Sequence, residues 1–253
     1  MTADALIEAL ALPDSTRINQ RVPKKLLAEQ AAATTADKRQ INEGIDEITW
    51  LAALKPQLIG VPEYRDAHRH YIELAILGLT LKPGAKSGRL TELLHRAVPY
   101  PVLLITESET GLKLSLAHLR TAQNEADKTV LDGNLLSVGV IDSTPDFLAA
   151  MALECQPQTD LFALYQGWID TVGALDIARE TGRFQPSHGR EHAAGRHAVL
   201  QQCRALHDRV TVLRGQAAKE KQMARQIALN QELHQIQGKL QVLQASLVEV
   251  SQA

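Results

Sequence analysis

The sequence is poor in aromatic residues, and it has no long apolar run. Only 4% of its 253 residues are aromatic, whereas 45% are hydrophobic, so the core must be packed mainly from Leu, Ile, Val and Ala. This composition favours a helix-rich fold over an aromatic-rich β-sandwich. No window approaches the roughly 18 to 20 consecutive apolar residues that cross a bilayer, which argues against membrane insertion.

Two further absences concern cellular location. The first twelve residues carry Asp4 and Glu8 and no basic residue, so they predict an amphipathic helix rather than a secretory signal. The two cysteines, Cys155 and Cys203, are far apart in the sequence, which is typical of a reducing compartment. We therefore expect a cytoplasmic protein in which both thiols are buried as small apolar side chains.

The charge is small overall but unevenly distributed. The net charge is −2, yet the segment from Pro186 onward has nine Lys or Arg against five Asp or Glu. That segment therefore carries +4, and the part before it carries −6. The C-terminal segment is thus the expected location of any phosphate-facing surface, although a solvated helix face explains so mild an excess equally well.

The first quarter of the chain predicts helices. Pro13–Thr16 predicts a turn, and Pro23 lies near the start of a short helix. From residue 36 to residue 54 apolar side chains recur every three or four positions, as on the buried face of one helix that Thr35 can cap. These side chains are Ile41, Ile45, Ile48, Leu51 and Leu54.

The next segment predicts a small mixed β-sheet. Apolar, β-branched or alternating runs indicate strands, and a leucine-rich run between two of them indicates a crossover helix. We expect the first strand at 71–81, a helix at 88–97 capped by Ser87, and strands at 102–106, 112–118 and 135–141. A right-handed crossover makes the first two strands parallel, and a hairpin adds an antiparallel neighbour, so the fold class is α+β with flanking helices.

Two helices and a linker are expected next. Pro145 suits the first turn of a helix over 147–154, and a second helix over 160–181 is closed by Gly182. Pro, Ser and Gly between residues 185 and 189 then punctuate two helical patterns. We therefore predict a head at 1–184, a linker at 185–198 and a helical arm at 199–253.

The arm carries the apolar spacing of a coiled coil. In two runs, apolar residues recur alternately four and three positions apart, as along the buried seam of a heptad repeat. The runs are Leu206, Val210, Leu213 and Ala217, then Ile236, Leu240, Leu243, Leu247 and Val250. Asn230 falls near a seam position. Each of the glycines in this region weakens a helix by about 1 kcal/mol relative to Ala, so we expect the arm to need a second copy or the head as partner.

Two kinds of interaction residue are expected in the arm. Basic side chains are candidates to contact a nucleic-acid backbone or an acidic protein, and such contacts would weaken with salt; they are Arg214, Lys219, Lys221 and Arg225. The seam is the candidate for protein contact, through Asn230, Ile236, Leu240, Leu243 and Leu247. Glu220 and Glu232 lie among the basic residues, as on an ordinary solvated helix.

Four segments of the chain resemble a bacterial family, the domain of unknown function 4391. In chain order they are Asn19-Gln20-Arg21-Val22-Pro23-Lys24, Ile45-Asp46-Glu47-Ile48-Thr49-Trp50, Val98-Pro99-Tyr100-Pro101, and Lys219-Glu220-Lys221-Gln222 with Arg225-Gln226 and Leu229-Asn230. The resemblance implies an uncharacterised protein encoded beside helicases and DNA methyltransferases in phage-defence or restriction-like clusters. It implies no catalytic residue, and fold-level analogy would not supply one.

Enzymatic alternatives rest on few residues. A metal-dependent nuclease would need carboxylates near strand ends, and Glu73, Glu107 and Glu109 are candidates by position, but no Asp followed by Glu-x-Lys surrounds the hairpin. His188, His192 and His197 have loose zinc-ligand spacing, which a polar linker explains better, and His68 and His70 read as surface residues. Residues 84–88 lack the upstream glycine of a phosphate-binding loop, and no nucleophile-elbow context is present.

The leading hypothesis is therefore a non-catalytic accessory or scaffold subunit of a bacterial anti-phage or restriction-like system. Its arm would bind a helicase or DNA methyltransferase of the same cluster, or a second copy of the chain. A nuclease effector and a DNA-binding module using the basic arm segment remain the alternatives. We expect no metal and no cofactor, and nucleic acid is a further candidate partner.

Overall fold

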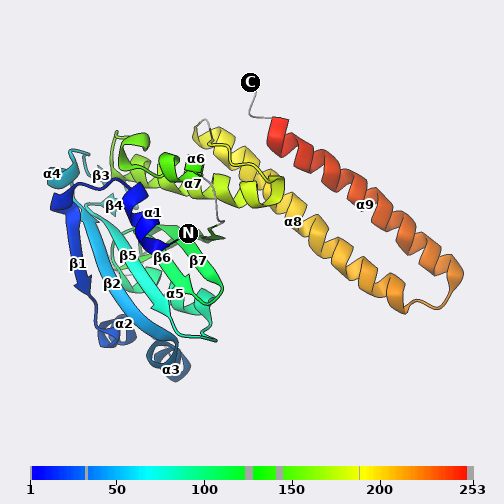
Figure 1. Cartoon of the computed structure of the whole chain (residues 1–253), viewed down its shortest axis with the longest axis horizontal. Coiled ribbons are helices and arrows are strands. Elements are labelled where there is room, and N and C mark those ends of the chain that lie inside the picture. Colours follow the sequence, from blue (N-terminus) through cyan, green and yellow to red (C-terminus); the bar gives the residue numbers. More distant parts are fainter. Residues whose placement is uncertain (1, 32–33, 123–127, 141–144, 188, 250–253) are drawn as a thin grey trace. The chain divides into compact units, whose positions relative to one another are not determined.

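The computed structural model describes residues 2–31, 34–122, 128–140, 145–187 and 189–249 (Figure 1). The chain forms two compact units, Met1–Val172 and Gly173–Ala253. Within the described residues of the first unit, six strands make one sheet in the order β1-β2-β5-β6-β7-β8. They are β1 Arg17–Arg21, β2 Ile45–Leu54, β5 Leu74–Leu81, β6 Val102–Ser108, β7 Gly111–Thr121 and β8 Thr129–Gly139. β5 and β6 are parallel, and the other neighbouring strands are antiparallel.

Helices connect and cover these strands. In the first unit they are α1 Ala3–Ala9, α2 Lys24–Gln30, α3 Thr35–Gly44, α4 Pro56–Ile59, α5 Ser87–Ala97 and α6 Pro145–Ala150, with 3-10 turns at Asp14–Thr16 and Leu153–Cys155. Helix α7, Leu161–Thr181, begins in the first unit and ends in the second. A separate two-stranded ribbon pairs β3, Tyr64–Arg65, with β4, His70–Tyr71. None of the described helices is both long and apolar enough to span a membrane.

The central strands are apolar on both faces because helices cover both. One face of β5 and β6 packs with α2, α3 and α5 in a single cluster of buried side chains, which includes Leu27, Ile41, Leu77, Leu79, Leu90, Leu94 and Leu104. The alternate residues Ile76, Leu103 and Ile105 are equally buried. On α7, the Tyr165 hydroxyl donates to the carbonyl of Val102 at 2.7 Å and accepts from the amide of Ala117 at 3.0 Å.

The α+β class, the mixed sheet and the helical C-terminal region are confirmed. So are the parallel crossover from β5 through α5 to β6, the β6–β7 hairpin and the Gly182 cap, where φ is +78°. The expected strand at 135–141 is the later part of β8, with residue 141 outside the described residues. Strand β8 begins earlier than predicted, at Thr129, and its residues Gly133 and Asn134 are exposed.

The prediction of one helix over residues 36–54 is wrong in its second half. Helix α3 ends at Gly44, and residues 45–54 form β2 between β1 and β5. Its helix-like spacing arises from irregular register: a shift between Ile45 and Glu47 puts Ile45 and Ile48 in the same apolar cluster although they are three residues apart. Pairing with two neighbours then satisfies the backbone of this Ile-, Thr- and Trp-containing segment.

Smaller corrections concern starts and caps. The segment 71–81 is not one strand, because β4 ends at Tyr71 and β5 begins at Leu74, and β1 and β2 precede it. Thr34 rather than Thr35 caps α3, by accepting a hydrogen bond from the amide of Asp37 at 3.1 Å. Lys86 occupies the cap position of α5, and Ser87 is the first helical residue. Cys155 is exposed, whereas Cys203 is buried as expected.

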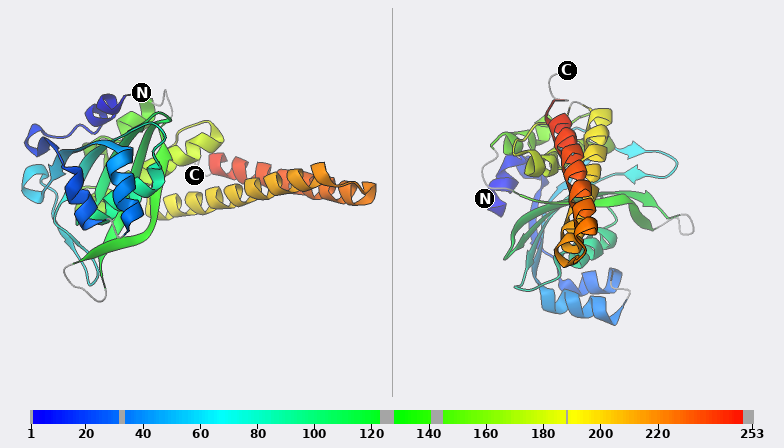
Figure 2. Two further views of the ribbon diagram at one scale, coloured as in Figure 1. Left: turned by 90° about the horizontal axis from the view of Figure 1, so that it is seen from below. Right: turned by 90° about the vertical axis from the view of Figure 1, so that its right-hand side faces the viewer.

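The second unit contains a helical hairpin, the α8–α9 hairpin. Helix α8, Arg190–Lys219, and α9, Met223–Glu249, lie side by side and antiparallel, joined by residues 220–222 (Figures 1 and 2). At one end Leu247 packs with Ile177, Leu200 and Cys203, and towards the other end Ile236 packs with Val210 and Leu213. An ion pair at 2.7 Å between Arg209 and Glu232 also joins the two helices.

The predicted domain boundaries at 184 and 198 remain a prediction. Residues 190–198, which the prediction placed in a linker, are however helical and form the first turns of α8. Gly189 precedes this helix with φ of +91°, a conformation that favours glycine. Arg196 is buried in these turns and donates to the carbonyl of Gln185 at 2.8 Å.

A buried histidine in the first unit gives a stability prediction. His95 of α5 is 1% exposed, and its Nε2 lies 2.9 Å from Ser115 Oγ of β7. Burial lowers the pKa of His95 to about 4. The folded protein therefore holds a neutral imidazole at pH values where the unfolded chain takes up a proton, so stability is full above about pH 6.5 and is lost as the pH falls towards 4.

We expect His95→Gln, which can keep the bond to Ser115, to remove this acid-sensitive loss, on the order of 3 kcal/mol between pH 7 and pH 4. Urea unfolding at several pH values would give the free energy of unfolding as a function of pH for the wild type and the variant. The slopes of the two curves would then be compared. The exposed His68 provides the control variant His68→Gln. Equal slopes for wild type and His95→Gln would contradict the prediction.

Candidate functional site

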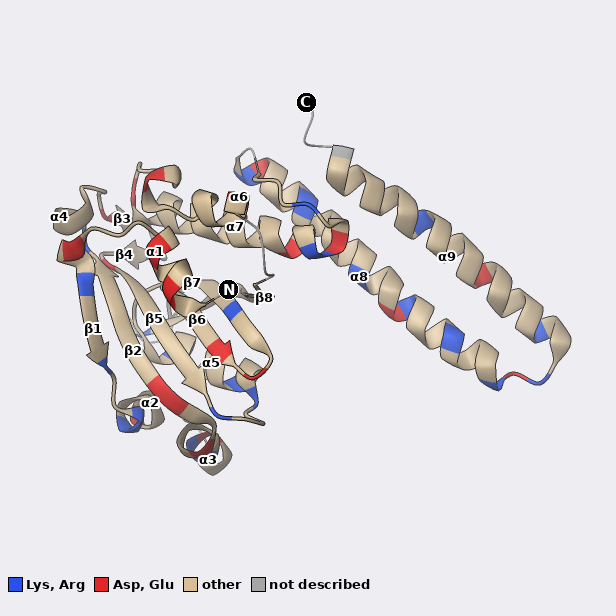
Figure 3. Ribbon diagram, viewed as in Figure 1, with Lys and Arg blue, Asp and Glu red and all other residues tan. Residues whose placement is uncertain are grey.

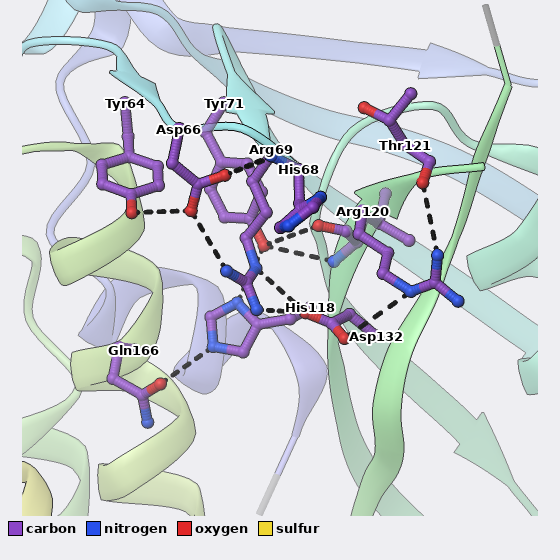
Figure 4. A network of polar contacts seen from close by, with 11 residues as sticks. Tyr64, Asp66, His68, Arg69, Tyr71, His118, Arg120, Thr121, Asp132 and Gln166 are labelled. Atoms are coloured by element: carbon purple, nitrogen blue, oxygen red, sulfur yellow. Dashed lines mark hydrogen bonds and ion pairs between the residues drawn. The ribbon is translucent and has the colours of Figure 1, made fainter. Parts of the chain in front are cut away.

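A polar network surrounds the turn between β3 and β4 (Figure 4). Asp66 organises this turn, because its Oδ1 accepts hydrogen bonds from the backbone amides of His68 at 2.7 Å and Arg69 at 2.6 Å. Its Oδ2 accepts from the Tyr64 hydroxyl at 2.9 Å and from the Arg69 guanidinium at 3.1 Å. The amide of His68, then Tyr64 and Arg69, lower the pKa of Asp66 to about 2.

Arg69 joins the turn to the main sheet. Its guanidinium bonds Asp66 on one side and Asp132 of β8 on the other, with a distance of 2.9 Å from Nε to Asp132 Oδ2. It also lies 5.5 Å from the ring centre of Phe162 on α7, within cation–π range. Burial works against the charge of Arg69, but the bonds to Asp132 and Asp66 outweigh it and raise its pKa. Arg69 is therefore a fixed cation.

Aromatic and imidazole side chains pack against one another beside Arg69. Phe162 stacks on Tyr64 and on His118, with ring centres 4.8 and 4.7 Å apart. His118 Nδ1 lies 2.8 Å from the Tyr71 hydroxyl, and its Nε2 lies 2.9 Å from Gln166 Oε1. Burial raises the pKa of Tyr71, which keeps its hydroxyl protonated. These contacts on both ring nitrogens fix the orientation of the His118 imidazole.

A hollow of about 380 Å³ opens beside the network, and we call it the arginine pocket. Its charged lining includes Arg65, Arg69 and Arg120, and its apolar wall includes Tyr71 and Pro101. A planar guanidinium group can donate two parallel hydrogen bonds to two oxygens of a phosphate or carboxylate. The chemistry that this lining offers is therefore recognition of an anion.

The sequence prediction missed the arginine pocket. It placed any phosphate-facing surface in the C-terminal segment, because net charge was counted over long segments. The pocket collects its arginines from residues 65–69 and from residue 120, inside the more acidic part of the chain. The run Arg65-Asp66-Ala67-His68-Arg69-His70 was the available local signal.

The structure separates the proposed nuclease carboxylates. Glu73 precedes β5, whereas Glu107 pairs with Thr80 near the far end of that strand. Seven residues at about 3.3 Å each put the two backbone positions roughly 23 Å apart. Glu73 is 8% exposed and lies 3.5 Å from Lys55, and Glu109 accepts a hydrogen bond from the amide of Gly84. These carboxylates do not form one site.

Metal-ligand candidates are likewise not brought together in the described residues. These residues contain no group of three or more His, Cys, Asp or Glu side chains that could hold a metal ion. His192 and His197 lie on α8, and His188 lies outside the described residues.

The predicted seam residues lie inside the α8–α9 hairpin. Ile236, Leu240 and Leu247 are buried, and Leu243 is half-buried. Ile236 packs with residues of α8, whereas Leu247 packs with α8 and also with Ile177 of α7, which lies within the predicted head. The need for a second copy of the chain stays a prediction. Asn230 is exposed, away from the seam, in a hollow with Ile227 and His234.

The predicted basic residues are all exposed near the loop that joins α8 and α9 (Figure 3). Lys219 and Arg225 line one shallow hollow together with Glu220 and Glu232. Lys221 lies in the loop itself, and Arg214 lies further back on α8. The structure therefore brings two of the four basic side chains into one place.

A second hollow on the α8–α9 hairpin is apolar, and we call it the hairpin groove. It is an open groove of about 680 Å³ lined by Gln202, Ala205, Leu206, Gly238, Lys239, Val242 and Leu243. Val242 is 70% exposed, an unusual position for an aliphatic side chain.

These features define an α+β protein with a mixed sheet, an arginine-lined pocket and a C-terminal helical hairpin. The chain belongs to the family described as domain of unknown function (DUF4391), whose model matches residues 10–240. The resemblance read from the sequence is thereby confirmed. No curated protein and no solved structure matches the chain.

The lowered pKa of Asp66 predicts an acid-sensitive turn. Its ionised form is stabilised in the fold, so this contribution is present above about pH 4 and is lost as the pH falls towards 2. We expect Asp66→Asn to destabilise the protein by about 1–2 kcal/mol at pH 7, because charge-assisted hydrogen bonds are lost, and the gap from wild type to shrink below pH 4. Urea midpoints at pH 7, 4 and 3 would test this, with the exposed Asp46→Asn as control.

Proposed function

We propose that this protein is a non-catalytic accessory subunit of a bacterial anti-phage or restriction-like system, acting in the cytoplasm. Its α8–α9 hairpin holds a helicase or DNA methyltransferase partner. The observation that carries this proposal is the hairpin groove, an open apolar surface between two helices. Contiguous exposed apolar surface commonly marks a contact with another protein.

The lining of the hairpin groove suits an incoming helix. Val242 and Leu243 offer aliphatic surface, while Ala205 and Gly238 allow a close approach. A side chain added at Gly238 would meet nothing within 4 Å, so this position is open to a partner. An amphipathic helix binding in such a groove is a common mode of peptide recognition.

The seam and the groove have separate roles in this proposal. We take the seam to be a short antiparallel coiled coil, in which Leu247 and Leu213 are at most 1% exposed and stabilise the hairpin. Val242 contributes little to that seam because it is largely exposed. The groove can therefore be altered without removing the contacts that fold the hairpin.

We expect Val242→Glu to reduce capture of the helicase or methyltransferase encoded beside this protein by about tenfold or more, because a carboxylate would be buried in the apolar contact. Capture of the purified neighbour by the tagged full chain would be measured, with circular dichroism to check folding. Val212→Glu is the matched control, since Val212 is an exposed valine on α8 that does not line the groove.

Unchanged capture by Val242→Glu would contradict the groove proposal, and so would an equal loss with Val212→Glu. Analytical ultracentrifugation of the chain alone tests the other occupant that the sequence suggested. A dimer dissociated by Val242→Glu would assign the groove to a second copy instead of a cluster partner.

DNA contact is the second candidate function, and the hollow shared by Lys219 and Arg225 favours it. Against it, Glu220 and Glu232 line the same hollow, although Glu232 is ion-paired with Arg209. We expect Lys219→Ala with Arg225→Ala to lower the affinity for duplex DNA. The slope of log affinity against log salt concentration should fall by about two, because two phosphate contacts are lost. Fluorescence anisotropy at several salt concentrations would show this, and Lys38→Ala on α3 is the control.

A further inference from the structure

The arginine pocket has cationic groups that the fold itself does not use. Arg69 is saturated by Asp66 and Asp132. Arg65 differs: its side chain makes no hydrogen bond or ion pair to the described residues, and it is exposed where it lines the pocket. Structural arginines are normally held by acceptors, so an unengaged guanidinium beside a hollow is available to a ligand.

Arg120 is the second such group. Its Nε lies 3.9 Å from Asp132 Oδ1, at the limit of an ion pair, and its terminal nitrogen makes one long bond of 3.4 Å to the carbonyl of Thr121. Asp132 is already engaged by Arg69 at 2.9 Å. One carboxylate thus lies between two guanidinium groups, and Arg120 keeps donors free to point elsewhere.

The charges around the pocket do not balance. Counted over the described residues, Arg65, Arg69 and Arg120 face Asp66 and Asp132, which leaves an excess of one positive charge. His70 lies 3.8 Å from Glu63, so that carboxylate faces the imidazole. This excess positive charge lies next to the fixed guanidinium of Arg69, so the site for an anion is preorganised.

The size and walls of the pocket narrow the class of anion. About 380 Å³ is within the range of small-molecule sites, roughly 300–1,000 Å³. Pro99 is an exposed apolar residue of the lining, and the buried side chains of Tyr71, Pro101 and Leu119 complete its apolar wall. A ligand that uses both parts carries a phosphate group next to a flat, weakly polar group.

From these contacts the geometry points to the arginine pocket as a binding site for a small phosphate-bearing ligand of the nucleotide class. Arg65 and Arg120 bind the phosphate, and Arg69 fixes the turn that follows Arg65. Pro99, the exposed part of the apolar wall, contacts the base or sugar. Its lining residues all belong to the first unit, whereas those of the hairpin groove belong to the second.

Isothermal titration of the full chain with AMP, with inorganic pyrophosphate and with a twelve-residue oligothymidylate tests the assignment. We expect saturable binding of AMP and of pyrophosphate, tighter for AMP because of the apolar wall. Arg65→Ala with Arg120→Ala should weaken both by about tenfold or more, since two charge-assisted contacts are removed. Arg120→Lys should recover only part of the affinity, because Lys lacks the planar donor pair.

Arg21→Ala is the matched control, because Arg21 is an exposed arginine on β1 outside the pocket. Thermal unfolding of each variant shows whether the fold is kept, and neither Arg65 nor Arg120 is a core residue. Absence of saturable binding, or an equal loss with Arg21→Ala, would overturn the proposal. A strong preference for oligothymidylate that the pocket variants abolish would overturn the small-ligand assignment in favour of a nucleic-acid phosphate.

Discussion

Strand β5 must be covered on both faces, and most of the first unit follows from that requirement. Six of its eight residues are buried, and successive side chains point into two apolar layers on opposite faces of the sheet. One layer is closed by α2, α3 and α5. On α7, Tyr165 bonds the backbone of β6 and β7 directly. A parallel β5–β6 pair with the crossover helix α5 is the arrangement in which such a strand is usually found.

This packing also creates the arginine pocket. Because α7 lies against β6 and β7, Phe162 reaches the β3–β4 turn and stacks beneath Arg69. Pairing of β7 with β8 puts Asp132 opposite His118, within reach of the same guanidinium. Arg69 and Asp132 are 63 positions apart in the chain. The site is therefore a consequence of the sheet register, and its cations are collected within the more acidic part of the sequence.

Two segments show how far periodicity can be trusted. In β2, register shifts break the two-residue alternation of a strand, and the resulting three-residue spacing of Ile45 and Ile48 imitates a helix. In the C-terminal region the four-and-three spacing correctly indicated a buried helical seam. The seam packs mainly on α8 of the same chain, and at one end Leu247 also packs on Ile177 of α7. Because only residues 220–222 join α8 to α9, pairing of the two helices within one chain costs little loop-closure entropy.

The sequence by itself determined the α+β class, the crossover from β5 to β6, the helical seam and the family to which the chain belongs. These features depend on the spacing of residues close together in the sequence or on the family pattern, so they can be predicted from the sequence alone. Only the tertiary structure decided what β2 pairs with, where the seam finds its partner, and that Arg65, Arg69 and Arg120 line one pocket. Those contacts join residues tens of positions apart, and they depend on strand register and helix docking, which local periodicity does not specify.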